Sequence, residues 1–379
     1  MISKHLMDNV LHLYGRLRAS VPVVLRRPLG VFCSVTGRCN LRCTYCWQRE
    51  DETREEGKAG WVSSVQAEMT PDEWTRLVER MPGGMFLGLT GGEVTISEAF
   101  EPMLRTAAER RIPVTVNSNG ATLRTKGIEL LLALGVRNLS ISLDGFAGVH
   151  DRVRQLPGLF DRIVANIGWF NAARGGRSRP ALTIKTVLLD DNLGELLEFR
   201  RFCAETLKAS CLNLSFAKVG DHAQLSLLYH DRLPEMLHGN PGALYPYKEP
   251  QRLRGVLAEL LAGNATSSCR VTLYPQMHDD SQVEGFLAHE GRGPYRACFL
   301  PWSMVWVLPD GTVTPCLSYW LGNVREHGMT VLGVLRGERY RDFLYGMKRF
   351  GDELPPACRV CCYARVRREK GVSGVFGGA

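Results

Sequence analysis

The chain has 379 residues, of which 45% are hydrophobic and 23% charged, and its formal net charge is +8. This length allows one large domain with a smaller second one, and the composition is typical of a globular protein. No run of about 18 apolar residues could cross a bilayer, and the N-terminus lacks the residue order of a secretory signal. We therefore expect a cytoplasmic protein without a transmembrane segment.

The positive charge is spread along the chain and does not gather in one block. The basic run 365–370 is more typical of a solvated helix face than of a nucleic-acid patch. We therefore expect no nucleic-acid partner. An anionic substrate, or an acidic electron donor such as flavodoxin, would suit the charge.

Apolar residues recur at helical spacing over 5–18. This pattern predicts an amphipathic helix within an N-terminal lead-in, 1–27. We expect its apolar face to pack on the main domain, with attachment to a membrane surface as the alternative.

After residue 27, short apolar runs alternate with helical patterns. Six such units in sequence predict an α/β fold with a parallel sheet and crossover helices. One helix start is clear, because Thr70 can cap, Pro71 takes the first position and Glu73 completes a capping box. The polar stretch 48–68 predicts a loop. The apolar runs lie at 30–35, 85–89, 113–117, 138–143, 182–188 and 212–217.

Unusual residues directly follow four of the predicted strands. They are the cysteines after the first strand, Gly91-Gly92-Glu93, Asn117-Ser118-Asn119-Gly120 and Asp144-Gly145. The carboxyl ends of parallel strands form one face of such folds, and this face carries the active site. We expect the four groups to converge there.

Cys39, Cys43 and Cys46 have the spacing Cys-x3-Cys-x2-Cys. Three thiolates can hold a four-iron cluster that leaves one iron open to a second molecule. A structural zinc site is the alternative, but it usually has four ligands with Cys-x2-Cys pairs. Twelve cysteines without an export signal favour metal ligation over disulfides.

This cysteine loop, with the aromatic Tyr45 before its third cysteine, resembles that of the radical S-adenosylmethionine (radical SAM) superfamily. The resemblance implies a partial (β/α)6 TIM-like barrel over 28–220 and a [4Fe-4S] cluster whose open iron binds S-adenosylmethionine. It also implies reductive release of a 5'-deoxyadenosyl radical, which abstracts hydrogen from unactivated carbon.

The same resemblance implies which residues meet S-adenosylmethionine. Gly91-Gly92-Glu93 is similar to the family's motif for the amino group, although the family often has proline where this chain has Val94. The His150-Asp151-x-x-Arg154 segment is similar to one whose arginine meets a carboxylate of the cofactor or substrate; a surface ion pair is the alternative. The expected cofactor-binding residues are Tyr45, Gly91, Gly92, Glu93, Asn117, Ser142, Asp144 and Arg154, with Arg154 also the catalytic candidate and Ser142 and Asp144 as hydroxyl partners.

A second group of cysteines lies near the C-terminus. A turn at Asp310-Gly311 predicts a hairpin that brings Cys298 and Cys316 together, and Cys358 and Cys361 would complete four ligands for zinc or a four-iron cluster. The pattern resembles the twitch domain, a shortened SPASM domain, which implies one auxiliary [4Fe-4S] cluster. The remaining cysteines are expected to be buried small hydrophobes: Cys33, Cys203, Cys211, Cys269 and Cys362.

These features predict a radical SAM oxidoreductase or maturase of natural-product type, with two [4Fe-4S] clusters and a flavodoxin- or ferredoxin-type reductant. We expect oxidation of a small polar metabolite, sugar- or aminocyclitol-like, because roughly thirty residues before the first strand are too few for a leader-peptide-binding domain. Modification of a ribosomal peptide is the alternative, and a non-catalytic iron-sulfur or zinc scaffold is a distant one. The expected divisions are 1–27, 28–220, a helical connecting region 221–297 and the cluster domain 298–379.

Overall fold

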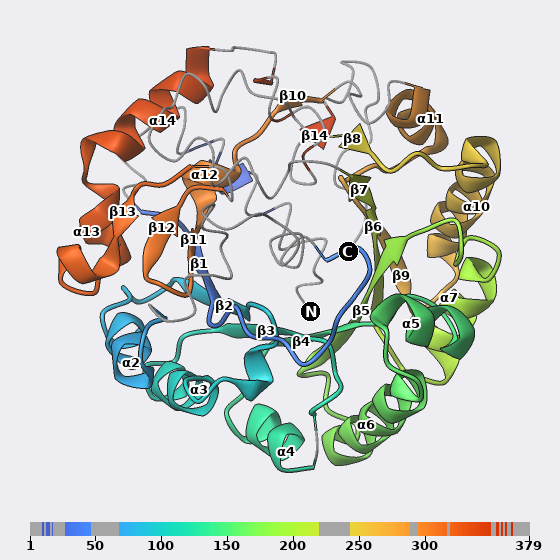
Figure 1. Cartoon of the computed structure of the whole chain (residues 1–379), viewed down its shortest axis with the longest axis horizontal. Coiled ribbons are helices and arrows are strands. Elements are labelled where there is room, and N and C mark those ends of the chain that lie inside the picture. Colours follow the sequence, from blue (N-terminus) through green and yellow to red (C-terminus); the bar gives the residue numbers. More distant parts are fainter. Residues whose placement is uncertain are drawn as a thin grey trace, which may run out of the picture.

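The computed structural model of the chain is built on one curved sheet. Ten strands follow the order β13-β12-β11-β1-β2-β3-β4-β5-β6-β9 and curl into a ring, with helices on the outside (Figure 1). The structure describes residues 10, 13–15, 17, 27–46, 68–123, 125–219, 243–288, 295–316, 319–349, 354–355, 358, 361 and 365–366.

The six predicted strands are confirmed, and all pair in parallel in chain order. They are β1 Gly30–Ser34, β2 Phe86–Thr90, β3 Val114–Ser118, β4 Asn138–Ser142, β5 Ala181–Leu188 and β6 Cys211–Phe216. The helices between them are α2 Pro71–Glu79, η3 Val94–Ile96, α3 Phe100–Glu109, α4 Thr125–Ala133, α5 Ala147–Arg154, α6 Leu159–Arg174 and α7 Leu196–Glu205.

Helix α2 begins as its sequence predicts. The Glu73 N–H donates to Thr70 Oγ1 at 3.2 Å, and the Thr70 N–H donates to a Glu73 carboxylate oxygen at 2.8 Å. These reciprocal bonds satisfy two backbone donors that the first turn of a helix cannot pair internally.

The sheet contains more strands than the six that we expected. Strand β9 (Arg270–Tyr274) pairs in parallel with β6, and β11 (Met304–Val307) pairs in parallel with the free edge of β1. An uncovered sheet edge exposes unpaired backbone groups, and these two strands cover both edges. Part of the expected connecting region and of the expected cluster domain therefore belongs to the main sheet.

The remaining elements complete this architecture. The predicted hairpin is confirmed, because β11 pairs antiparallel with β12 (Thr312–Thr314), which pairs with β13 (Gly322–Asn323). Helix α10 (Pro250–Ala262) confirms the helical pattern expected over 249–262; the one expected over 228–238 lies outside the described residues. The other elements are β7 Lys218–Val219, β8 Ala243–Leu244, η4 Gly263–Ala265, α11 Asp280–Ala288, β10 Tyr295–Ala297, α12 Leu300–Ser303, η5 Val324–His327, α13 Val331–Leu335, α14 Glu338–Arg349 and β14 Arg365–Val366.

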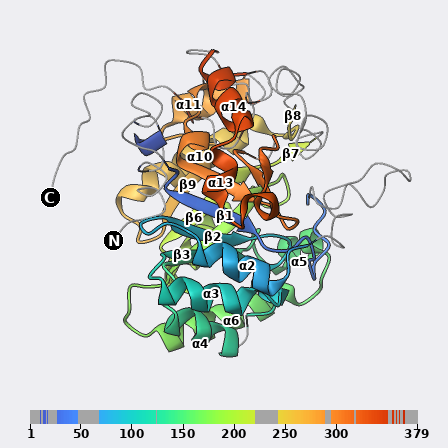
Figure 2. The same cartoon turned by 90° about the vertical axis from the view of Figure 1, so that its left-hand side faces the viewer.

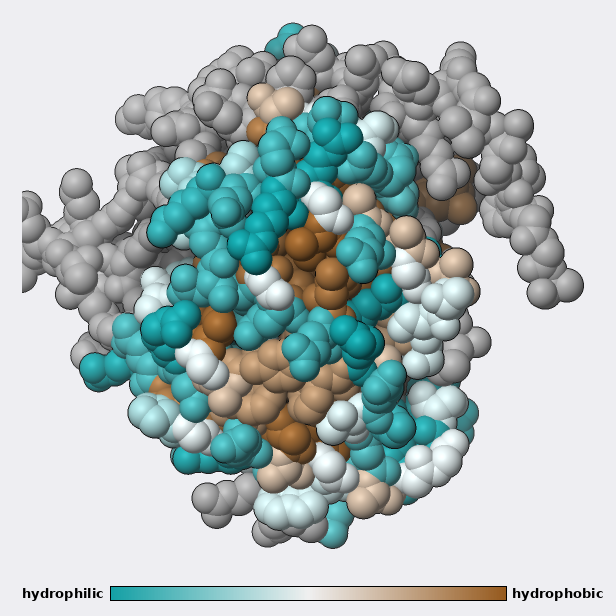
Figure 3. Space-filling model, turned by 90° about the vertical axis from the view of Figure 1, so that its right-hand side faces the viewer, coloured by the Kyte–Doolittle hydropathy of each residue, from teal (hydrophilic) through white to brown (hydrophobic). Residues whose placement is uncertain are grey.

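The sheet buries its apolar side against the helices. In side view, α13 and α14 continue the row of helices that contains α2 and α3 (Figure 2). Leu87, Val116 and Ile184, from β2, β3 and β5, are at most 1% exposed. On the flank of α7 and α10, apolar residues appear between polar side chains (Figure 3). None of the helices in the described part of the chain is long and apolar enough to cross a membrane.

Part of the expected N-terminal helix lies outside the described residues, including Leu6, Met7 and Leu11 of its apolar face, so its packing stays a prediction. Val10, Leu13 to Gly15 and Leu17 are helical. Gly15 is buried so closely that a Cβ atom there would lie 2.1 Å from the Phe299 carbonyl oxygen. Val10, Leu13 and Leu17 are 41%, 56% and 49% exposed. The contact therefore runs through Gly15, because only a residue without a side chain allows this approach.

Candidate active site

The cysteine loop continues the pairing of β1 and β2 beyond the ends of both strands. The Val35 N–H donates to the Thr90 carbonyl at 2.8 Å, the Gly92 N–H to the Thr36 carbonyl at 2.7 Å and the Glu93 N–H to the Arg38 carbonyl at 2.9 Å. These backbone hydrogen bonds hold the cysteine loop directly against Gly91-Gly92-Glu93.

Gly91 and Gly92 allow this contact. A Cβ atom on Gly91, whose φ is +144°, would lie 2.6 Å from the Thr36 carbonyl oxygen, and one on Gly92 would lie 2.2 Å from the Arg38 carbonyl oxygen. We expected these glycines to contact S-adenosylmethionine, and that contact stays a prediction. The room they leave is filled by the backbone of the cysteine loop, so they are needed before any ligand binds.

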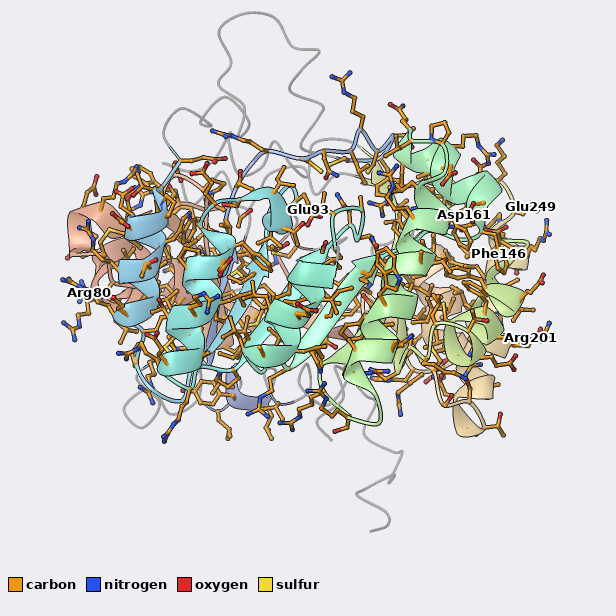
Figure 4. The ribbon with its side chains drawn as sticks, turned by 90° about the horizontal axis from the view of Figure 1, so that it is seen from below. Arg80, Glu93, Phe146, Asp161, Arg201 and Glu249 are labelled. Carbon is orange, nitrogen blue, oxygen red and sulfur yellow. The ribbon has the colours of Figure 1, made fainter. Side chains whose placement is uncertain are left out.

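Glu93 links three segments. It is 1% exposed and lies near the middle of the molecule in Figure 4, whereas Arg80 and Arg201 lie at the rim. Its carboxylate accepts hydrogen bonds from Ser118 Oγ at 2.8 Å and from the Asn119 N–H at 2.6 Å. Its expected contact with the amino group of S-adenosylmethionine stays a prediction.

Asn119 is a site residue that the sequence reasoning missed. Its amide Nδ2 donates to Asn40 Oδ1 at 2.8 Å and lies 3.9 Å from Cys39 Sγ. The signal was present in Asn117-Ser118-Asn119-Gly120, from which we chose Asn117. Asn117 lies two residues earlier, within β3, and its Oδ1 accepts from Lys185 Nζ at 2.8 Å, so its expected cofactor contact stays a prediction. Ser142, at the end of β4, is next to Lys185 in the register.

A buried ion pair between Arg154 and Asp144 contacts the cysteine loop. Arg154 Nε donates to Asp144 Oδ2 at 2.7 Å, and Arg154 Nη1 donates to Cys43 Sγ at 3.4 Å. The Tyr45 hydroxyl donates to the same Asp144 oxygen at 2.7 Å, and the guanidinium lies 5.4 Å from the centre of the Tyr45 ring. The Arg154 side chain is 9% exposed, so the surface-ion-pair alternative is excluded.

Burial and neighbouring charges shift the pKa values of Arg154 and Tyr45. Burial lowers the pKa of Arg154, but Asp144, Tyr45 and Cys43 more than compensate and raise it well above its ordinary value. Burial and the Asp144 charge raise the pKa of Tyr45. Arg154 therefore stays cationic and Tyr45 stays neutral beside the Cys43 sulfur.

Asp144 is fully buried, and both of its oxygens accept hydrogen bonds from protein. Oδ2 accepts from Arg154 and Tyr45, and Oδ1 accepts from the Val187 N–H at 3.0 Å. The Asp144 N–H donates to His150 Nδ1 at 3.1 Å, and burial lowers the pKa of His150 to about 4, so this imidazole is neutral. The expected role of Asp144 as a hydroxyl partner stays a prediction, whereas the described contacts orient Arg154.

The four C-terminal cysteines are expected to share one cluster, and this ligand set stays a prediction. Cys298 precedes α12 and Cys316 follows β12, while the Cys361 N–H donates to the Cys358 carbonyl at 3.1 Å. Burial raises the pKa of Cys358 well above its ordinary value, and the charges of Cys361, Cys298 and Cys316 raise it further. Cys362 lies outside the described residues, and the other expected core cysteines are buried: Cys33, Cys203, Cys211 and Cys269.

The segment 68–73 ties the two cysteine sites together. The Glu68 carboxylate accepts from the Gly37 N–H at 2.6 Å, and the Met69 N–H donates to the Pro309 carbonyl at 2.7 Å. Arg325 forms two hydrogen bonds with the Glu73 carboxylate, at 2.7 and 2.9 Å. The hairpin between Cys298 and Cys316 is thus attached to the start of the first cysteine loop.

The donor sets of both cysteine groups suit iron-sulfur clusters. Zinc draws thiolates to about 2.3 Å from one centre, whereas in a cluster each thiolate binds its own iron. The donor set is thiol-only, and the N–H donors near Cys39 and Cys43 suit cluster thiolates.

Comparison with known proteins agrees with this geometry. The family model "Radical SAM superfamily" matches residues 33–203, and the model "Iron-sulfur cluster-binding domain" (SPASM) matches residues 298–362. The AdoMet-dependent heme synthase of Methanosarcina barkeri is 35% identical over 347 residues, which cover 88% of each chain. The sporulation killing factor maturation protein SkfB of Bacillus subtilis is 29% identical over 157 residues, 41% of this chain and 34% of SkfB.

A solved structure shows the same fold. Streptococcus suis SuiB, crystallised with S-adenosylmethionine, aligns with a TM-score of 0.59 at 15% identity and covers 89% of this chain and 72% of SuiB. The expected fold class and cofactor set are therefore confirmed: a partial TIM-like barrel with a SPASM-type domain, of a kind that binds [4Fe-4S] clusters and S-adenosylmethionine.

Proposed function

Because this chain belongs to the radical SAM superfamily and carries a SPASM domain, we propose that it oxidises a small polar metabolite by a radical mechanism. A four-iron cluster with an open iron supplies the electron that cleaves S-adenosylmethionine to a 5'-deoxyadenosyl radical. Cys39, Cys43 and Cys46 would hold this cluster.

The second cysteine site is the observation that supports oxidation of the substrate. Hydrogen abstraction leaves a substrate radical, and oxidation to a carbonyl or a new bond requires removal of one further electron. The electron acceptor would be held by four cysteines: Cys298, Cys316, Cys358 and Cys361. The first two flank the hairpin, whose strand β11 pairs directly with β1.

The chain itself supplies binding, orientation and electrostatics. The Gly91-Gly92 backbone and Glu93 hold the cysteine loop, and Arg154 places a cation beside the Cys43 sulfur. The inner face of β3 to β6 carries amide and hydroxyl side chains, which favours a polar substrate. We expect a flavodoxin- or ferredoxin-type reductant and a cytoplasmic location.

Peptide modification is the second candidate. It is favoured by the relative SkfB, which is named a maturation protein, and by a crystal structure of SuiB bound to precursor peptide SuiA. The heme synthase relative adds a tetrapyrrole to the substrates to test, because its match covers most of both chains. Each class is tested with the same readout, 5'-deoxyadenosine formation above the uncoupled rate.

The decisive experiment separates the two cysteine sites. Anaerobically reconstituted protein should hold about eight irons, and the triple replacement of Cys39, Cys43 and Cys46 by alanine should halve this and abolish S-adenosylmethionine cleavage. Cys358→Ala should keep cleavage but lose product formation. Iron content and circular dichroism control for folding, because a metal can stabilise a small domain. Stoichiometric zinc, or normal product formation by folded Cys358→Ala, would contradict the oxidative proposal.

The substrate class is tested by three additions to the wild type. These are a cell extract of molecules below about 1 kDa, Fe-coproporphyrin III, and synthetic peptides encoded beside the gene. We expect the small-molecule extract to raise 5'-deoxyadenosine formation at least tenfold. Stimulation by a peptide or by the porphyrin alone would replace the metabolite proposal with the corresponding candidate.

A further inference from the structure

Buried side chains hold both polar groups of the Asp144 backbone. The Asp144 N–H donates to His150 Nδ1 at 3.1 Å, and the Asp144 carbonyl accepts from Asn192 Nδ2 at 2.9 Å. His150 and Asn192 are both fully buried. A hydrogen bond in such an interior is electrostatically stronger than one in water. Two side chains from different segments, α5 and the loop between β5 and α7, therefore fix where Asp144 lies.

Asn192 joins the carboxyl ends of β4 and β5. Besides its bond to Asp144, its Nδ2 donates to the Val187 carbonyl at 2.7 Å, and its Oδ1 accepts from the Leu189 N–H at 3.0 Å. An amide side chain has two donor hydrogens, and the two carbonyls use both. The Val187 N–H in turn donates to Asp144 Oδ1 at 3.0 Å. Asn192 therefore sets the spacing between Asp144 and the strand that supports its carboxylate.

His150 forms its bond to Asp144 at a cost. A neutral imidazole accepts at one nitrogen and carries its proton on the other, so the bond to Nδ1 leaves the proton on Nε2. This Nε2 is buried, and within the described part of the chain it has no hydrogen-bond partner. A buried donor without a partner destabilises the folded state, whereas an apolar side chain of similar shape would avoid this penalty. A histidine at this position is therefore explained by the acceptor that it provides for the Asp144 N–H.

His150 and Arg154 meet Asp144 from the same helix, α5. Residues four positions apart are neighbours on a helix surface. His150 binds the Asp144 backbone, and Arg154 Nε donates to the Asp144 carboxylate at 2.7 Å. The same guanidinium places its Nη1 3.4 Å from Cys43 Sγ. A shift of Asp144 would therefore move the cation relative to the sulfur.

We infer that His150 and Asn192 are positioning residues, which fix Asp144 and thereby hold Arg154 beside the Cys43 sulfur. The inference rests on the proposed function, because a cluster bound to Cys43 is the group that would respond to the position of Arg154. A cation beside a cluster thiolate stabilises the reduced state of the cluster. Loss of either side chain frees Asp144, lets Arg154 move away from Cys43 and makes the cluster harder to reduce.

The test is a redox titration of the first cluster in the reconstituted protein, with the auxiliary signal removed by Cys358→Ala. His150→Leu removes the acceptor for the Asp144 N–H, whereas His150→Asn keeps an acceptor near the position of Nδ1. Asn192→Leu removes the amide. Its matched control is Asn171→Leu, because Asn171 Nδ2 likewise donates to a backbone carbonyl, at 2.8 Å, but from α6.

We expect His150→Leu and Asn192→Leu each to lower the equilibrium constant for one-electron reduction at least about threefold, a shift of about 28 mV at about 59 mV per tenfold change. His150→Asn and Asn171→Leu should both stay within about 1.5-fold of the parent protein, a shift of about 10 mV. Circular dichroism and iron content establish that each variant is folded and loaded. If a leucine variant does not load, Asn192→Ser makes the same comparison with a smaller change.

A double-mutant cycle separates positioning of Arg154 from a general loss of structure. In an Arg154→Gln background, His150→Leu should cause no further shift, because the side chain through which it acts is gone. A shift of the same size with and without Arg154 would overturn the inference. So would shifts of His150→Leu and Asn192→Leu that do not exceed the shift of Asn171→Leu.

A second measurement distinguishes this inference from the proposed function. Uncoupled S-adenosylmethionine cleavage is assayed in the same preparation. A first cluster whose potential depends on His150 through Arg154, in a protein that does not cleave S-adenosylmethionine, would refute the radical function and support the positioning role. Cleavage by a protein whose cluster potential is independent of His150 and Asn192 would overturn the positioning role and leave the radical function standing.

Discussion

Arg154 should control the reduction potential of a cluster bound to Cys43. Its Nη1 lies 3.4 Å from the Cys43 sulfur inside a buried pair with Asp144. Reduction adds negative charge to a cluster, so a nearby cation stabilises the reduced state, and this is one of the ways in which proteins tune such potentials. Arg154→Gln should therefore make the potential more negative, and Asp144→Asn should make it less negative.

The magnitude follows from the distances. A unit charge 3.4 Å away interacts by about 5 kcal/mol at an effective dielectric constant of about 20. The added electron spreads over the whole cluster, and Asp144, 2.7 Å from Nε, opposes the arginine, which together reduce the effect to about 1 to 2 kcal/mol. This corresponds to roughly 40 to 80 mV, because one tenfold change for one electron is about 59 mV.

The assay is a redox titration followed by electron paramagnetic resonance, in a Cys358→Ala background that removes the auxiliary signal. Arg152→Gln is the matched control, because Arg152 lies on the same helix but its side chain is 59% exposed and pairs with Asp191 at the surface. We expect a shift for this control below about 20 mV, since exposed charges are screened. A shift of Arg154→Gln that is no larger than the control, or that is positive, would refute the reasoning.

Two further predictions concern the contacts that hold the cysteine loop and the hairpin. Gly92→Ala should lose the first cluster and about half of the iron, because its Cβ would meet the Arg38 carbonyl at 2.2 Å, whereas Gly255→Ala, with nothing within 4 Å, should keep full iron content. Hydrogen bonds from Arg325 lower the pKa of Glu73 from 4.5 to about 2. The stability that these bonds give to the folded state is therefore complete above pH 4.5 and is lost as the pH falls through about 2. Arg325→Gln should therefore lower the free energy of unfolding by about 1 to 2 kcal/mol at pH 7, allowing for the partial exposure of the pair, and urea titrations should show the difference shrinking towards pH 3. A difference that is constant with pH would contradict this linkage.

The sequence by itself determined the elements whose signals are local. The spacing of Cys39, Cys43 and Cys46, the capping box at Thr70 and six apolar runs each span a few residues, and each predicts chemistry or structure from neighbouring positions alone. The turn at Asp310-Gly311 likewise predicted the hairpin, which the structure confirms.

Only the tertiary structure decided what joins distant segments. The pairing of β11 with β1 depends on an edge that exists once the sheet has formed, and three- or four-residue strands carry too little pattern to predict it. Arg154 and Cys43 are 111 residues apart in sequence, and Lys185 and Asn117 are 68 apart. Side-chain alternation predicts that a residue faces inward, but the curvature and register of the sheet determine which inward residues meet.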